Sequence, residues 1–175
     1  MARLVKPSLK FEREYLAALK ESKRERQVTR LTEPKGSFED FVRTYKDMEK
    51  GKNLPKYYVP ATKYWLVDGS HFLGWITVRH RLTARLRDFG GHIGYWIRPK
   101  YRNKGFGTLI LKLGLQKAKQ LGIKKILITC SPSNPASRKI IERNGGKFLD
   151  VRCARTHFNT KEVRFWIDLH ERSLR

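Results

Sequence analysis

The stretch IRPKYRNKGFGTLILKLGL, residues 97–115, joins a strongly basic loop to a helix-like apolar pattern. Gly105 and Gly107 lie between these two parts, just before a helix that the apolar spacing predicts over residues 108–120. The first N–H groups of a helix have no intrahelical partner, and the helix dipole is positive there. Because glycine lets an anion come close to bare backbone, and because Arg102 and Lys104 add charge, the loop predicts a phosphate or pyrophosphate site.

Two common phosphate-binding motifs do not match this loop. The pattern GxxxxGK[ST] is absent from the sequence, and Ile110 occupies the third glycine position of the dinucleotide-binding pattern GxGxxG. The acidic ribose ligand of that second motif is also missing, since the following apolar run KKILITC contains none. A turn that only connects a strand to a helix remains the alternative explanation for two isolated glycines.

Hydrophobic periodicity around the loop predicts mixed α and β structure. A strand over residues 92–97 precedes the loop, and the apolar run over residues 124–130 predicts another strand after the helix. Such a crossover makes the two strands parallel. We expect helices over about residues 11–26, 36–51 and 133–146, one turn or irregular structure over 83–91, a hairpin over 63–81 with its turn at Asp68-Gly69, and a closing antiparallel pair over 147–155 and 161–169.

Capping residues mark the ends of two of these helices. Ser37 followed by Asp40 resembles a capping box, and Gly51 ends the same helix. Asn134 stands at the N-cap of the later helix, with Pro135 at its first position and Gly145 just past its end.

Composition limits the class of protein. A length of 175 residues with 39% hydrophobic residues predicts one domain over residues 1–175. The formal charge of +23 indicates an acidic or nucleic-acid partner, although the basic residues are scattered along the chain. Two cysteines without metal-ligand spacing predict free thiols and no metal site. The sequence lacks the apolar run of a signal peptide or membrane span, so we expect a cytoplasmic protein without membrane contact.

The pattern Arg102-x-x-Gly105-x-Gly107 follows a strand ending in IRP and precedes a helix, a strand and the helix NPASRKIIERNGG. This order resembles the acetyl-CoA core of the GCN5-related N-acetyltransferase (GNAT) family over about residues 66–148, and the segments LVKPSLKFEREYL and NLPKYYVPATKYWLVDG are similar to a bacterial branch of it. The resemblance implies an α/β (α+β) fold with a mixed, mostly antiparallel central sheet, flanking helices and a parallel β-α-β core.

The family resemblance also implies an activity and a site. We expect acetyl-CoA as co-substrate, without a metal, and direct transfer of the acetyl group to a primary amine of a small molecule or protein. Backbone N–H groups of the loop would hold the pyrophosphate, and the edge of the preceding strand would bind pantetheine. The residues implied in cofactor binding are Trp96, Ile97, Arg98, Arg102, Asn103, Lys104, Gly105, Phe106, Gly107, Thr108, Asn134 and Arg138. For Asn134, helix capping alone is the alternative role.

One departure from the family pattern concerns the general acid. Many members have a tyrosine seven residues after the asparagine, where this chain has Ile141. Tyr95 is a candidate replacement, and His92 is a candidate general base because its ordinary pKa lies near neutrality. Packing is the alternative role for both. The missing tyrosine also leaves open a member that binds CoA without catalysis, and the charge leaves open a nucleic-acid-binding or ribosome-associated module. The acceptor and the oligomeric state are not encoded in any motif.

Overall fold

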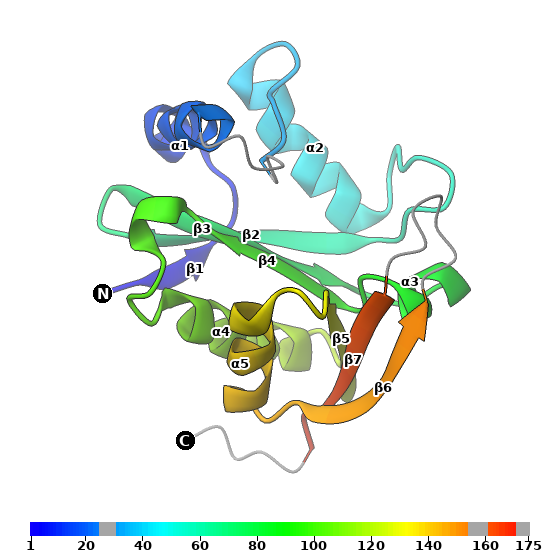
Figure 1. The fold of residues 1–175 in the computed structure, drawn as a ribbon. Helices are drawn as coiled ribbons and strands as arrows, with labels where there is room; N and C mark the ends of the chain where they lie inside the picture. Colours follow the sequence, from blue (N-terminus) through cyan, green and yellow to red (C-terminus); the bar gives the residue numbers. More distant parts are fainter. Residues whose placement is uncertain (25–30, 154–160, 171–175) are drawn as a thin grey trace.

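Two antiparallel sheets with helices packed on them form the fold of the computed structural model, which describes residues 1–24, 31–153 and 161–170 (Figure 1). The first sheet has the strand order β1-β2-β3-β4 and the second β5-β7-β6. The strands are β1 Arg3–Val5, β2 Ala61–Asp68, β3 His71–Arg79, β4 Ile93–Ile97, β5 Lys125–Cys130, β6 Lys147–Cys153 and β7 Lys161–Asp168. The helices are α1 Glu12–Arg24, α2 Phe38–Lys50, α3 Ala84–Asp88, α4 Phe106–Gln120 and α5 Pro135–Arg143, with 3-10 turns η1 Leu9–Phe11 and η2 Pro99–Tyr101.

The predicted helix caps are confirmed. The Ser37 hydroxyl accepts a hydrogen bond from the Asp40 N–H, and Gly51 ends α2 in the left-handed conformation at φ 72°. The Asn134 side chain caps α5 by accepting from the Ser137 N–H. The predicted single turn before β4 is the short helix α3. The far end of the first predicted helix, at residues 25–26, and the end of the strand predicted over 147–155 lie outside the described residues.

The helices cover both faces of the first sheet (Figure 1). One face carries Ile93 and Ile97 of β4, which belong to the apolar cluster that includes α4. The other face carries Trp96, which belongs to an aromatic cluster shared with α1 and α2. Because side chains alternate along a strand, Tyr95 lies on the α4 side and Gly94 on the α1 and α2 side. The two faces of β4 therefore contact different clusters, the apolar cluster with α4 and the aromatic cluster with α1 and α2.

The strands β4 and β5 meet at one point and belong to separate sheets. The His92 N–H donates to the Leu127 carbonyl at 2.7 Å, while the Leu127 N–H donates to Nδ1 of the His92 ring at 2.9 Å. In a continued parallel ladder, a backbone carbonyl would accept the Leu127 N–H. Here the imidazole of His92 accepts it instead. Next to this junction, a Cβ on Gly91 would lie only 2.3 Å from the Leu127 carbonyl oxygen.

The expected mixed architecture, mostly antiparallel and flanked by helices, is confirmed. The structure refines it in one respect: every ladder among the described strands is antiparallel, and the predicted parallel β-α-β core is a crossover through α4 between two sheets. Beyond His92, the edge of β4 that faces away from β3 is therefore not covered by β5. This open edge positions the site.

Candidate functional site

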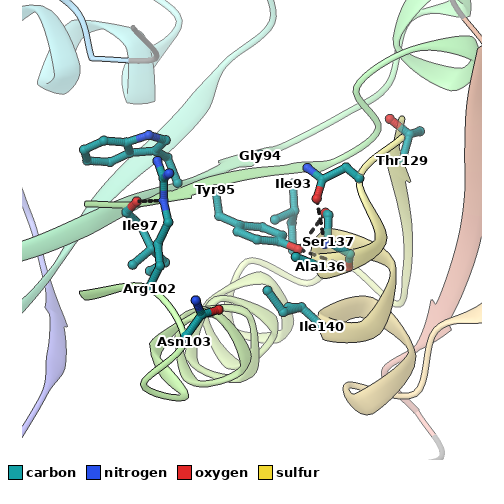
Figure 2. Close-up of a pocket in the computed structure, with 13 residues that line it drawn as sticks. Ile93, Gly94, Tyr95, Ile97, Arg102, Asn103, Thr129, Ala136, Ser137 and Ile140 are labelled. Carbon is teal, nitrogen blue, oxygen red and sulfur yellow. Dashed lines mark hydrogen bonds between the residues drawn. The ribbon is translucent and has the colours of Figure 1, made fainter. Parts of the chain in front are cut away.

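A cavity of about 430 Å³ lies along the open edge of β4 (Figure 2). Strand β4, the loop that follows it, the first turn of α4, the end of β5 and the first two turns of α5 all contribute to its wall. The lining residues are Ile93, Gly94, Tyr95, Trp96, Ile97, Arg102, Asn103, Gly107, Thr129, Asn134, Ala136, Ser137 and Ile140. The structure thus brings Tyr95 and six of the residues predicted for cofactor binding to one cavity: Trp96, Ile97, Arg102, Asn103, Gly107 and Asn134.

The start of α4 supplies backbone donors to one end of this cavity. The helix begins at Phe106, two residues before the predicted start, with Gly105 as an N-cap that makes no side-chain hydrogen bond. The bond from the Leu109 N–H to the Gly105 carbonyl is the first of the helix, so the N–H groups of residues 106–108 precede the intrahelical ladder. These groups, at the positive end of the helix dipole, can bind an anion.

The two glycines of the loop serve different purposes. Gly105 has φ +81°, and a Cβ there would meet no atom within 4 Å, so its backbone conformation requires glycine while the surrounding space remains open. At Gly107 a Cβ would lie 2.5 Å from Cδ1 of Ile140, so glycine there permits close packing of α4 on α5. The role of both glycines in admitting an anion stays a prediction, and Gly107, which lines the cavity, also has a packing role.

Arg102 and Asn103 frame the same end of the cavity, as Figure 2 shows. Nε of Arg102 donates to the Ile97 carbonyl at 3.1 Å, which holds the guanidinium against the open edge of β4. Asn103 is exposed and adopts φ +60°, the left-handed region that asparagine tolerates better than most residues. Lys104 is exposed and lies 5.9 Å from the Tyr101 ring, outside the lining. Positive charge and backbone donors therefore converge at the start of α4.

At the opposite wall, the Tyr95 side chain of β4 points toward Ser137 on the first turn of α5 (Figure 2). The Tyr95 hydroxyl shares a hydrogen bond of 2.9 Å with the Ser137 hydroxyl. Oδ1 of Asn134 accepts from the Ser137 N–H at 3.0 Å, so the predicted capping role is confirmed, and the same residue lines the cavity. A tyrosine hydroxyl is thus fixed beside the cavity by a polar partner from another element.

His92 is located at the junction of the two sheets and is not among the lining residues. Its side chain is buried, and burial lowers the pKa of the imidazole to about 4, against the opposing effect of the hydrogen bond from Leu127. The ring is therefore neutral at physiological pH, with Nδ1 engaged as an acceptor. This geometry corresponds to the packing alternative for His92.

Arg98 is not among the residues that line the cavity. Its side chain is 1% exposed and contacts α1, where Nε and Nη2 donate to Glu21 at 2.7 and 2.6 Å and Nη1 donates to Glu14 at 2.9 Å. Its N–H donates to the Leu73 carbonyl. The buried guanidinium therefore anchors the loop after β4 to α1, and the cofactor contact of Arg98 stays a prediction. Arg138 is also outside the lining and pairs with Glu142 at 2.8 Å.

Apart from Asn134, sequence reasoning missed the cavity wall that α5 provides. Ala136, Ser137 and Ile140 line the cavity, together with Thr129 at the end of β5. Helical spacing from Asn134 could have identified Ser137 and Ile140, since residues three apart share a helix face. Ile141, at the position of the family tyrosine, is fully buried in the apolar cluster. Of the three predicted residues that begin α4, Phe106, Gly107 and Thr108, only Gly107 lines the cavity.

Within the described ranges, no group of three or more His, Cys, Asp or Glu residues could hold a metal ion. None of the helices described is both long enough and apolar enough to span a membrane.

Comparison with known proteins gives a consistent result. The family model described as acetyltransferase (GNAT) domain matches residues 9–147. No curated protein matches the sequence. Among solved structures, the chain is similar to the microcin C7 self-immunity acetyltransferase MccE in complex with acetyl-CoA and AMP, with 17% identity, coverage of 96% of this chain and 92% of that chain, and a TM-score of 0.68.

Two further solved structures share the fold. One is yncA, a putative acetyltransferase from Salmonella typhimurium with its cofactor acetyl-CoA, at 11% identity, coverage of 98% of this chain and 96% of that chain, and a TM-score of 0.66. The other is the spermidine/spermine N-acetyltransferase SpeG from Vibrio cholerae, in mutant forms, at 14% identity, the same coverage of 98% and 96%, and a TM-score of 0.64.

Proposed function

Because this chain belongs to the acetyltransferase (GNAT) family, we propose that it transfers an acetyl group from acetyl-CoA directly to a primary amine. The observation that carries the proposal is the uncapped start of α4 at one end of the cavity along β4. The cavity is lined by both polar and apolar residues, as a phosphate-bearing molecule with an extended arm requires. The co-substrate supplies an acetyl thioester, and the residues of this chain bind and orient it.

The pyrophosphate is bound by the N–H groups at the start of α4. The open space beside Gly105 accommodates its oxygens, and the Arg102 guanidinium neutralises part of their charge. The family model supports this assignment, and so do the two neighbours whose names include acetyl-CoA, since they share the fold. Lys104 is exposed close to the same loop and adds to the local positive potential.

The pantetheine arm lies along the open edge of β4. In the antiparallel register with β3, the bonds from Arg79 N–H to His92 and from Arg98 N–H to Leu73 place even-numbered residues on the β3 side. The backbone groups of residues 93, 95 and 97 are therefore directed toward the cavity edge. Backbone N–H groups at this edge stabilise the negative charge that develops on the thioester oxygen during attack.

Tyr95 protonates the departing sulfur. Its hydroxyl is held at the cavity wall by Ser137, and Ile141, at the usual acid position, is in the core. The described lining residues include no carboxylate, histidine or lysine, so the acceptor amine loses its proton to water, directly or through a water chain. His92 has a packing role at the sheet junction. The rate is accordingly expected to rise with pH as the neutral fraction of the amine increases.

Two measurements test this proposal. Calorimetric titration of the purified protein with acetyl-CoA is expected to show saturable binding at a single site, and release of free CoA is expected on addition of an amine acceptor. Absence of binding at high micromolar acetyl-CoA would refute the proposal. Binding without turnover of any amine would identify a family member that binds CoA without catalysis.

A further inference from the structure

Gly94 connects the cavity to the face of the sheet that carries α1 and α2. It lines the cavity, and a Cβ there would lie 3.9 Å from Cζ3 of Trp75 and 4.0 Å from a terminal nitrogen of Arg79. Both neighbours are on β3. Lys63 of β2 is on the same face, with its ammonium nitrogen 3.5 Å from the centre of the Trp75 ring. A tryptophan and two cations therefore adjoin the cavity next to Gly94.

These two cations lack a carboxylate partner among the described residues. Nη1 of Arg79 donates only to neutral oxygens, the carbonyls of Gly90 and Gly91, each at 3.0 Å. The contacts of the Lys63 ammonium are with the rings of Trp75 and Tyr45, the latter at 5.7 Å. The carboxylate of Glu49 on α2 is engaged with Lys6 and Thr62. Within the described part of the chain, the positive charges of Lys63 and Arg79 are thus not paired with a carboxylate.

The two buried arginines among the described residues, Arg98 and Arg164, are neutralised. Arg98 pairs with Glu14 and Glu21, and Arg164, which is also buried, pairs with Asp150 at 2.6 Å. A half-buried cation normally needs such a partner because loss of hydration disfavours the charged form. The cluster of Lys63, Arg79 and Trp75 differs from these structural ion pairs.

This arrangement disfavours the charged form of the Lys63 ammonium. Burial, and secondarily repulsion by Arg79, lowers its pKa to about 7. The indole N–H of Trp75 is also buried without a hydrogen-bond partner among the described residues. The cluster therefore has an excess of donors and positive charge, which an anion bound beside it would offset.

We propose that Lys63 and Arg79 bind an anionic group of the acceptor, so that the acceptor is an amine whose own molecule carries a carboxylate or phosphate close to the amino group. The inference rests on the proposed acetyl transfer. The amine would lie at the cavity beside Gly94, with its anionic group over Arg79 and Lys63. A polyamine would instead place additional positive charge against these two cations and be repelled.

The experiment compares acceptors and reverses one charge. Steady-state acetylation is measured with spermidine, with phosphoethanolamine, with glutamate and with a short peptide that has a free N-terminus followed by Asp and Glu. The wild-type protein is expected to favour at least one anionic amine over spermidine by tenfold or more in kcat/KM. A preference for the peptide would indicate that the acceptor is a protein with an acidic N-terminal segment. A preference for phosphoethanolamine or glutamate would indicate a small-molecule acceptor.

Lys63→Glu is expected to lower kcat/KM for the preferred anionic amine by tenfold or more and to narrow or invert the ratio to spermidine. Lys124→Glu, an equal change of charge at an exposed position before β5, is the matched control and should leave the ratio unchanged. Should Lys63→Glu not fold, Lys63→Gln is measured instead, with loss for anionic amines and no loss for spermidine expected.

Calorimetric titration with acetyl-CoA alone separates the two proposals. Normal acetyl-CoA affinity in Lys63→Glu, with altered acceptor preference, supports the inference. Turnover that favours spermidine in the wild-type protein, or an acceptor ratio that Lys63→Glu does not change, would overturn the inference and leave the proposed function intact. A wild-type protein that neither binds acetyl-CoA nor acetylates any of the amines would overturn the proposed function and this inference together.

Discussion

Replacement of Gly105 by alanine tests the anion site at the start of α4. The residue is in the left-handed region at φ +81°, and a Cβ would contact no atom within 4 Å, so the substitution adds backbone strain without a steric clash. A residue with a Cβ in this region costs about 1–2 kcal/mol. In the free protein the exposed loop can relax out of this conformation, and binding must then restore it. The strain therefore opposes binding, and the Kd of acetyl-CoA is expected to rise about 5- to 30-fold.

Gly122→Ala provides the matched control at the other end of the same helix. Gly122 has φ +77°, and a Cβ there would also meet nothing within 4 Å. Gly122→Ala should lower the free energy of unfolding, measured by urea denaturation, by on the order of 1–2 kcal/mol. Gly105→Ala should lower it by less, because its loop relaxes in the free protein. Only Gly105→Ala should weaken acetyl-CoA binding in calorimetry. An unchanged Kd in Gly105→Ala, or an equal increase in both variants, would refute the assignment of the pyrophosphate to this helix start.

Three further predictions concern side chains at or near the cavity. Tyr95→Phe should lower kcat on the order of 100-fold while leaving the Kd of acetyl-CoA unchanged, and an unaltered kcat in steady-state assays would exclude Tyr95 as the acid. Arg98→Met should reduce the free energy of unfolding in urea by about 3 kcal/mol, because Glu14 and Glu21 lose their shared partner; a change below about 1 kcal/mol would contradict that role. Burial lowers the pKa of His92 to about 4 in the folded protein, from about 6.5 in the unfolded protein. The neutral ring therefore contributes fully to the free energy of unfolding above pH 6.5, and this contribution is lost as the pH falls toward 4. The free energy of unfolding should therefore fall by roughly 3 kcal/mol between pH 6.5 and pH 4, and His92→Asn should make it depend less on pH. Identical pH profiles of the unfolding free energy in the wild-type and His92→Asn proteins would contradict this role of His92.

Local features of the fold could be predicted from the sequence because they depend on neighbouring residues. The cap of α2 at Ser37, its end at Gly51 and the cap of α5 at Asn134 follow from side-chain and backbone preferences within a few residues. The helix after the basic loop, predicted to start two residues later than it does, and most of the cavity wall along β4 follow from the same local pattern.

Long-range contacts could not be predicted in this way. Arg98 appeared to belong to the basic loop, but its partners Glu14 and Glu21 are 84 and 77 residues away in the sequence. The separation of β4 from β5 depends on a hydrogen bond between the His92 ring and Leu127, which no hydrophobic period encodes. The same ring appeared suitable for catalysis because only its ordinary pKa, and not its burial, can be inferred from sequence.

Gly91, beside the junction of β4 and β5, has φ +57° and approaches the backbone of Leu127 and Ile128 so closely that a side chain would push the two strands apart. Gly91 lies beside the backbone bond between His92 and Leu127, from which β4 and β5 continue in separate sheets, and it is outside the cavity lining. Because the cavity lies between these diverging elements, a displacement of the two strands at Gly91 would change the width of the cavity. The size of the molecules that fit between the two strands thus depends on the fold as well as on the side chains that line the cavity.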